Sequence, residues 1–324
     1  MKRRGTHPAS WAVQVALVAA PLVAAFAITD NSLLDSLNQV LIATVLSLSW
    51  NILGGYARQI SVGHVAFYGI GAYTSTLLAV DFGISPWLGM FAGGAIAAAT
   101  ATLLGLATFR LRGPFFTMAT IAFAEVVRIL AVNLRSLTRG AEGLSIDSTP
   151  HPAQFVFADL RSYVLVTWAL MLVVFLVSKY LDLSKTGLRL RAMRENEDTA
   201  RALGIGTFWL RIGALATSAF FTAIAGTFYA QYLLLIDPDS VLGVDISLQM
   251  ALTAVVGGIG SAIGPVLGTY LVVPFGQFLR AELGSQLTGL HLVIYGLGLV
   301  LVLYKLPNGI WPAIEGAIIR RTRR

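Results

Sequence analysis

The chain has 324 residues, of which 56% are hydrophobic and only 12% are charged. A soluble domain is about one-quarter Asp, Glu, Lys and Arg, so half that density excludes a soluble enzyme, a disordered chain and a nucleic-acid binder with a polar shell. The chain contains no cysteine, which excludes disulfides, thiolate metal sites and cysteine nucleophiles, and the meaning of its +7 net charge depends on where its 23 basic residues lie.

Apolar runs long enough to cross a bilayer recur along the chain. A hydrocarbon core of about 30 Å requires roughly 20 apolar residues in a helix. Six runs precede the most polar region and three follow it: residues 11–28, 33–53, 61–80, 86–108, 115–131 and 162–178, then 212–233, 246–279 and 288–304. The sequence therefore predicts an all-α polytopic membrane protein with a single transmembrane domain over residues 1–324.

The run at 246–279 is long enough for one long helix or two short ones. Residues 257–265 read GGIGSAIGP, and four glycines and a proline in so short a stretch favour a break. With two half-length helices there, we expect about ten transmembrane helices, some of them short or broken.

The distribution of charge supports ten crossings. If both termini are cytoplasmic, most basic residues fall on the inner side, above all in the loop 179–211, while the outer side collects most acidic residues and the loop 132–161. Nine crossings would place the basic residues at 320–324 outside. The basic N-terminus, first apolar run and small residues at 25–27 also resemble a cleavable secretory signal, and both interpretations of this segment leave the remaining topology unchanged.

The inner loop carries a helical pattern. Apolar and small residues recur at helical spacing from Leu188 to Leu203, and Gly204 is a typical helix stop. A short helix of this kind suits docking into a cleft on a soluble partner. The alternative is a solvated loop or a helix lying on anionic headgroups, because cytoplasmic loops are generally basic.

Few ionisable residues lie within the apolar runs. Glu125 and Arg128 are three residues apart, so they share a helix face and either form an ion pair or contact a substrate. His64, near Tyr68 and Tyr73, is either a hydrogen-bonding residue in helix packing or a proton relay. We take His64, Tyr68, Tyr73 and Glu125 as candidates for a substrate path.

Other functional classes find little support. Glu125 is the only candidate for the titrating acid of a proton-coupled secondary transporter. His64 and Glu125 have no metal-ligand or nucleophile companions at useful spacing, which disfavours a membrane-embedded enzyme. The sequence also contains no Gly-x4-Gly-Lys-Ser/Thr phosphate loop, so the chain cannot bind ATP in that way.

Four stretches, in order, resemble the LivM-type permease subunits of bacterial branched-chain amino-acid ABC importers. They are GYARQISVGHVAFYGIGAYT at 55–74, LRGPFF at 111–116 with AFAEVVR at 122–128, RAMRENE at 191–197 with ALGI at 202–205, and GGIGS at 257–261 with GPVLG at 264–268. One departure is TRGAEGL at 138–144, where relatives usually have two adjacent glycines after the threonine. This makes the outer loop more charged, which affects docking of a binding protein or the choice of substrate.

The resemblance implies a function and a set of partners. Such a subunit carries branched-chain amino acids inward by alternating access, is not itself an enzyme, and lies in the bacterial cytoplasmic (inner) membrane with both termini cytoplasmic. It implies a second homologous permease, two cytoplasmic ATPases that bind the ATP, and an extracytoplasmic solute-binding protein, with no cofactor in this chain. Similar subunits import urea and short-chain amides, so the resemblance does not decide which solute is carried.

The resemblance also assigns a role to the inner loop. In this family a cytoplasmic coupling helix sits in a groove of the ATPase and transmits its closure to the spans. The residues implied in this coupling are Arg191, Arg194, Glu195, Asn196, Asp198, Ala200, Leu203 and Gly204.

Overall fold

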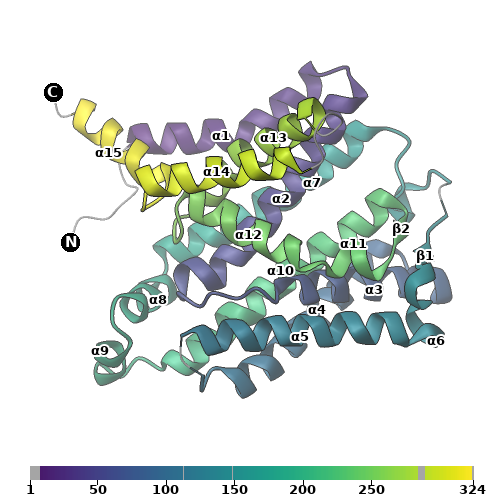
Figure 1. The fold of residues 1–324 in the computed structure, drawn as a ribbon, viewed down its shortest axis with the longest axis horizontal. Helices are drawn as coiled ribbons and strands as arrows, with labels where there is room; N and C mark the ends of the chain where they lie inside the picture. Colours follow the sequence, from purple (N-terminus) through teal and green to yellow (C-terminus); the bar gives the residue numbers. More distant parts are fainter. Residues whose placement is uncertain (1–7, 112, 148, 284–288, 323–324) are drawn as a thin grey trace.

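The computed structural model describes residues 8–111, 113–147, 149–283 and 289–322, and the regular structure in these ranges is almost entirely helical. The long helices lie side by side, with α1 and α14 along one edge and α5 along the other (Figure 1). Several basic residues that bear on the predicted charge distribution lie outside the described residues: Lys2, Arg3, Arg4, Arg112, Arg323 and Arg324.

Most of the helices are long. The first half of the chain forms α1 (Pro8–Ala27), α2 (Asn31–Asn51), the π-helix η1 (Ile52–Tyr56), α3 (His64–Phe82), α4 (Pro86–Thr108), α5 (Pro114–Asn133), α6 (Arg135–Thr138), the 3-10 turns η2 (Gly140–Glu142) and η3 (Pro152–Gln154), and β1 (Leu144–Ser145). The second half forms α7 (Leu160–Leu183), α8 (Lys185–Glu195), α9 (Glu197–Ala202), α10 (Thr207–Leu233), β2 (Leu235–Ile236), α11 (Pro238–Leu242), α12 (Val244–Gly257), α13 (Gly264–Leu283), α14 (Leu290–Lys305) and α15 (Ile310–Thr322).

The helix lengths confirm an all-α polytopic membrane protein. Within the described residues, eight helical segments are long and apolar enough to cross a membrane, or nine if the bent pair α14 and α15 forms one span. The break expected at 257–265 is present, since α12 ends at Gly257 and α13 begins at Gly264. α13 is 20 residues long, but its C-terminal half carries Gln277, Arg280 and Glu282. This helix is therefore not one of the eight segments that are apolar enough to cross a membrane. A tenth crossing stays a prediction.

Glycine allows the central helices to pack closely. A Cβ on Gly226 of α10 would overlap the backbone carbonyl of Tyr68 in α3, and one on Gly71 would overlap the backbone of Ala223. On its other side Gly71 faces Gly93 of α4. Lipid tails are as apolar as leucine, so helices in a bilayer associate through such close contacts and through hydrogen bonds.

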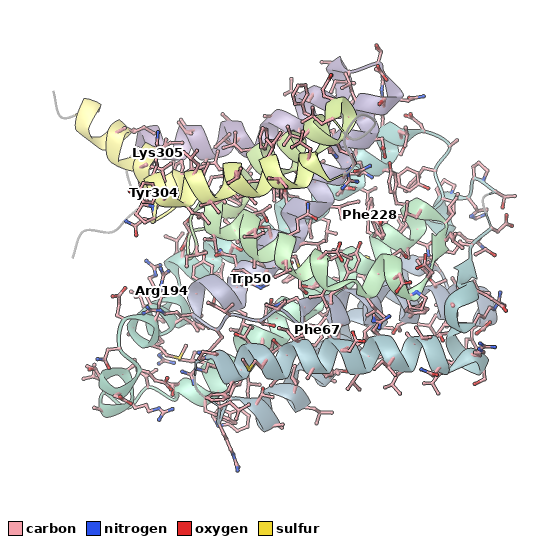
Figure 2. The ribbon with its side chains drawn as sticks, in the orientation of Figure 1. Trp50, Phe67, Arg194, Phe228, Tyr304 and Lys305 are labelled. Carbon is pink, nitrogen blue, oxygen red and sulfur yellow. The ribbon has the colours of Figure 1, made fainter. Side chains whose placement is uncertain are left out.

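The two ends of the bundle differ in structure. At one end β1 pairs with β2 in an antiparallel two-stranded sheet, with Leu144 opposite Ile236. At the other end lie α8 and α9, together with the start of α1 and the end of α15 (Figure 1). Trp50 and Phe67 lie inside the bundle, whereas Arg194 lies on the α8 side (Figure 2).

The close contact between α10 and α3 gives a test of this packing. We expect Gly226→Ala to destabilise the protein by about 1–3 kcal/mol, because the new methyl group would meet backbone that cannot rotate away. Gly213→Ala on the same helix is the control, since its Cβ meets no described atom within 4 Å. Thermal unfolding in detergent measures both, and equal melting temperatures would contradict the close packing.

Candidate functional site

The polar segment between α7 and α10 forms two short helices. Ser184 caps α8, because its side chain accepts a hydrogen bond from the Gly187 amide at 3.1 Å. The sequence pattern predicted one helix from 188 to 204, which is wrong: the backbone is extended at Asn196, whose side chain caps α9 by accepting from the Thr199 amide at 2.9 Å. Gly204 adopts a φ of +79° after α9, as expected of a helix stop.

The candidate coupling residues divide into two groups in the structure. Glu195, Asn196, Asp198, Leu203 and Gly204 are exposed at the end of the molecule. The others are turned toward the bundle: Ala200 is buried, while Arg191 and Arg194 are half-buried and donate hydrogen bonds to backbone carbonyls of Asp182 and Gly55. The first group is the more accessible to a second protein.

An exposed apolar patch lies beside these residues. Leu203 and Trp209 are 75% and 69% exposed, and they lie among the charged side chains of α9 and the start of α10. They border an open pocket of about 460 Å³ whose lining also includes Arg189, Ile205 and Leu210. Large apolar side chains in such a setting mark a contact with another protein or a membrane.

Glu197 holds α9 to the start of α10 and was missed by the sequence argument. Its carboxylate accepts from Arg201 at 2.5 Å and from Arg211, whose side chain is only 10% exposed. Thr207 donates to the same carboxylate at 3.4 Å. The spacing of Glu197 and Arg201 signals an ion pair on one helix turn, whereas the contact with Arg211 depends on the fold.

His64 lies in a chain of buried hydroxyl groups. Its Nε2 is 2.8 Å from Oγ of Ser218, and its Nδ1 is 3.0 Å from Oγ of Ser61. Ser218 donates its single proton to the Ser49 carbonyl at 2.6 Å, so the Nε2 of His64 is the donor in their contact. The Nε2 bond joins α3 to α10 and, through Ser218, to α2, while the Nδ1 bond holds His64 to Ser61 in the loop before α3.

The four substrate-path candidates lie on two helices, with His64, Tyr68 and Tyr73 on α3 and Glu125 on α5. The ring of Tyr68 is 5.6 Å from that of Tyr229 on α10, and Tyr73 is also buried. Glu125 is half-exposed on α5, where it accepts two hydrogen bonds from Arg128, at 3.0 and 2.6 Å. The ion pair that their spacing suggested is present, and Arg128 extends it to Asp239 of α11 at 3.5 Å.

No group of three or more His, Asp or Glu side chains lies close enough together to hold a metal ion in the described parts of the chain. The arrangement at the α8 and α9 end consists of ion pairs, helix caps and exposed side chains. The ion pairs and caps can hold neighbouring helices in position, and the exposed side chains can bind a second protein.

The fold and this exposed end define a helical, multi-pass membrane protein. A family model described as the permease component of the branched-chain amino acid transport system matches residues 32–303. The chain therefore belongs to the permease family of branched-chain amino-acid ABC transporters.

Individual relatives agree with this membership. The chain is 29% identical to the high-affinity branched-chain amino acid transport system permease protein LivM of Escherichia coli, over 86% of this chain and 69% of that protein. The LivM protein of Salmonella typhimurium is 28% identical over the same shares. LivH of Escherichia coli is 26% identical, over 82% of this chain and 90% of that protein. No solved structure matches the chain.

The ion pairs of Glu197 give a prediction for stability. We expect Glu197→Gln to cost about 1–3 kcal/mol, because Arg211 would keep a largely buried charge without its carboxylate. Asp198→Asn, at the next and exposed position of α9, is the control and should have little effect. Thermal unfolding and the rate of tryptic cleavage at Arg201 measure the difference; similar values for the two variants would contradict it.

Proposed function

We propose that the chain is a permease subunit of an ABC importer that moves branched-chain amino acids inward across the bacterial inner membrane. The observation that carries this proposal is the family match over residues 32–303, together with relatives whose names specify high-affinity branched-chain amino acid transport. Because the relatives include both LivM and LivH proteins, we propose a second, homologous permease as the direct partner.

The exposed end formed by α8 and α9 is proposed to dock a cytoplasmic ATPase. Its exposed candidates, Glu195, Asn196, Asp198, Leu203 and Gly204, offer charges, a backbone turn and an apolar side chain. The basic residues of this segment favour the cytoplasmic side. Since the start of α1 and the end of α15 lie at the same end of the bundle, both termini would be cytoplasmic as well (Figure 1).

The proposed mechanism is alternating access without covalent chemistry in this chain. Two partner ATPases bind and hydrolyse the ATP, and their closure displaces α8 and α9. The bundle then opens toward a solute-binding protein docked at the opposite end, near β1 and β2. The solute passes along a path that need not be strongly selective, because the binding protein selects it.

A proton-coupled transporter is less well supported by the geometry. Glu125 is the acid that the sequence suggests for this role, and its carboxylate is held in a two-bond ion pair with Arg128. A group that carries protons must lose and regain its charge, which would leave Arg128 without that partner. Import of urea or short-chain amides is a second candidate, because importers of these solutes use similar membrane subunits.

The substrate is tested by uptake in proteoliposomes containing the permeases, the ATPases and the binding protein. We expect ATP-dependent uptake of leucine that excess isoleucine and valine reduce more than tenfold and that urea, aspartate and lysine leave unchanged. Inhibition by urea would favour the second candidate. Uptake driven by a proton gradient without any ATPase would refute the ABC mechanism.

The docking surface is tested by Asp198→Lys, which reverses an exposed charge on α9. We expect about tenfold weaker binding of the ATPase, equal to about 1.4 kcal/mol, and a matching loss of ATP-dependent uptake. Asp81→Lys, an exposed position near the end of α3, is the control for ATPase binding. Affinity of the purified ATPase for each variant is the measurement, and equal affinities would remove Asp198 from the interface.

A further inference from the structure

The two glycine-rich breaks of the chain, about 200 residues apart in sequence, meet beside α8. One is η1, where Gly54 and Gly55 follow α2, and the other is the loop 258–263 between α12 and α13. The side chain of Asn51 joins them: its Nδ2 donates to the Ser261 carbonyl at 3.0 Å, and its Oδ1 accepts from the Gly260 amide at 2.9 Å. The backbones touch, since a Cβ on Gly55 would lie 2.6 Å from the Gly260 nitrogen.

Arg194 of α8 reaches into this junction. Its Nη1 donates to the Gly55 carbonyl at 3.2 Å, and it lies so close to Gly260 that a Cβ there would overlap the same nitrogen. Gly260 has a φ of +74°, a backbone conformation that favours glycine. In return, Arg58, just after η1, donates to the Arg194 carbonyl at 3.0 Å.

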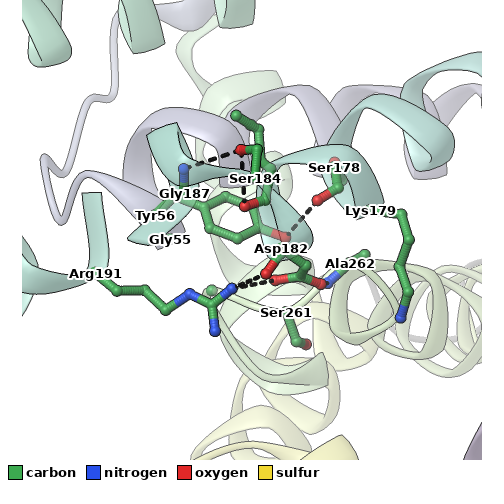
Figure 3. A network of polar contacts seen from close by, with 12 residues as sticks. Gly55, Tyr56, Ser178, Lys179, Asp182, Ser184, Gly187, Arg191, Ser261 and Ala262 are labelled. Carbon is green, nitrogen blue, oxygen red and sulfur yellow. Dashed lines mark hydrogen bonds and ion pairs between the residues drawn. The ribbon is translucent and has the colours of Figure 1, made fainter. Parts of the chain in front are cut away.

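A second arginine of α8 reaches the same loop through Asp182. Arg191 donates to the Asp182 carbonyl and lies 3.8 Å from its carboxylate, whose other oxygen accepts from the Ala262 amide at 3.4 Å. Figure 3 shows Tyr56 beside this pair, where its hydroxyl donates to the Ser178 carbonyl at 3.1 Å. Arg191 therefore connects α8, the end of α7 and the loop 258–263.

These contacts connect α8 to both glycine-rich breaks, which are η1 and the loop 258–263. Arg191 and Arg194 are three residues apart and so lie on one face of α8. Each reaches the loop 258–263, through Asp182 or directly at Gly260, and Arg194 also holds η1. A π-helix within a long helix often marks a functional site, and here it ends the central helix α2. A displacement of α8 must move η1 and this loop or break these bonds.

We propose that these contacts, which we call the α8 clasp (Arg191 with Asp182, and Arg194 with Gly55 and Gly260), transmit the displacement of α8 into α2, α12 and α13. The clasp residues are positioning residues for transport and touch neither solute nor nucleotide. The proposal rests on the proposed function for the source of the displacement. The structural part of the proposal is that α8 restrains the loop 258–263, and this part does not depend on any partner protein.

The restraint is tested first on the purified permease, without any partner. The natural chain has no cysteine, so Ser261→Cys introduces a single reactive thiol into the loop. In this background we expect Arg194→Met and Asp182→Asn each to raise the rate of maleimide labelling at least fivefold. Lys185→Met, an exposed position on α8 outside the clasp, should leave the rate unchanged. Unchanged labelling in both clasp variants would overturn the proposal.

Transmission is tested next in the reconstituted complex. We expect both clasp variants to retain the ATPases and to hydrolyse ATP within about twofold of the wild-type rate, while solute uptake per ATP falls about tenfold. Arg194→Lys keeps a donor for the Gly55 carbonyl and should recover part of this ratio. A purely structural role would lower melting temperature, hydrolysis and uptake together at an unchanged ratio, and that result would overturn the proposal.

The two tests separate failure of the clasp from failure of the proposed function. If the wild-type complex shows no ATP-driven uptake, the proposed function fails and the labelling rates alone decide on the clasp. If the wild-type complex transports and the clasp variants transport with the same ratio, the clasp is refuted and the proposed function stands.

Discussion

Many polar groups inside this helix bundle find partners within the chain, because a bilayer core offers no water to bond them. The hydroxyl groups around α2 show how this is achieved. Thr44 of α2 is 2.7 Å from Thr269 of α13, and the Ser49 carbonyl accepts from Ser218 of α10, which is in turn bonded to His64 of α3. These bonds fix helices that are far apart in sequence to one central helix.

Close packing and hydrogen bonding depend on each other here. Gly71 and Gly226 bring α3 against α10, and that approach is what places Ser218 within reach of His64. The same principle operates at the α8 end, where Gly55 and Gly260 allow two backbones to touch and Asn51 to bond both sides. Glycine at these positions therefore determines where the polar groups meet as well as how closely the helices pack.

At the polar end of the bundle, α8 and α9 differ in what their side chains contact. On α8, Arg191 and Arg194 are turned inward to the backbone of the bundle. Around α9, Asp198 and Leu203 face outward, and Glu197 holds α9 to α10 through Arg211. An arrangement with an outward face for contact and an inward face for attachment is suited to passing on a movement, which is the role proposed for it.

The sequence by itself determined the protein class, most membrane segments and the family, since apolar runs, charge placement and motif order are local properties of the chain. It also indicated the break at 257–265, the stop at Gly204 and the pair of Glu125 with Arg128, because glycine clusters and helical spacing act over a few residues. It did not predict the capping by Asn196 that divides α8 from α9. Only the tertiary structure decided that Arg194 meets Gly55 and Gly260, that Glu197 binds Arg211, and that His64 bonds Ser218. These contacts join residues from distant parts of the chain, and their partners are set by how the helices pack in three dimensions.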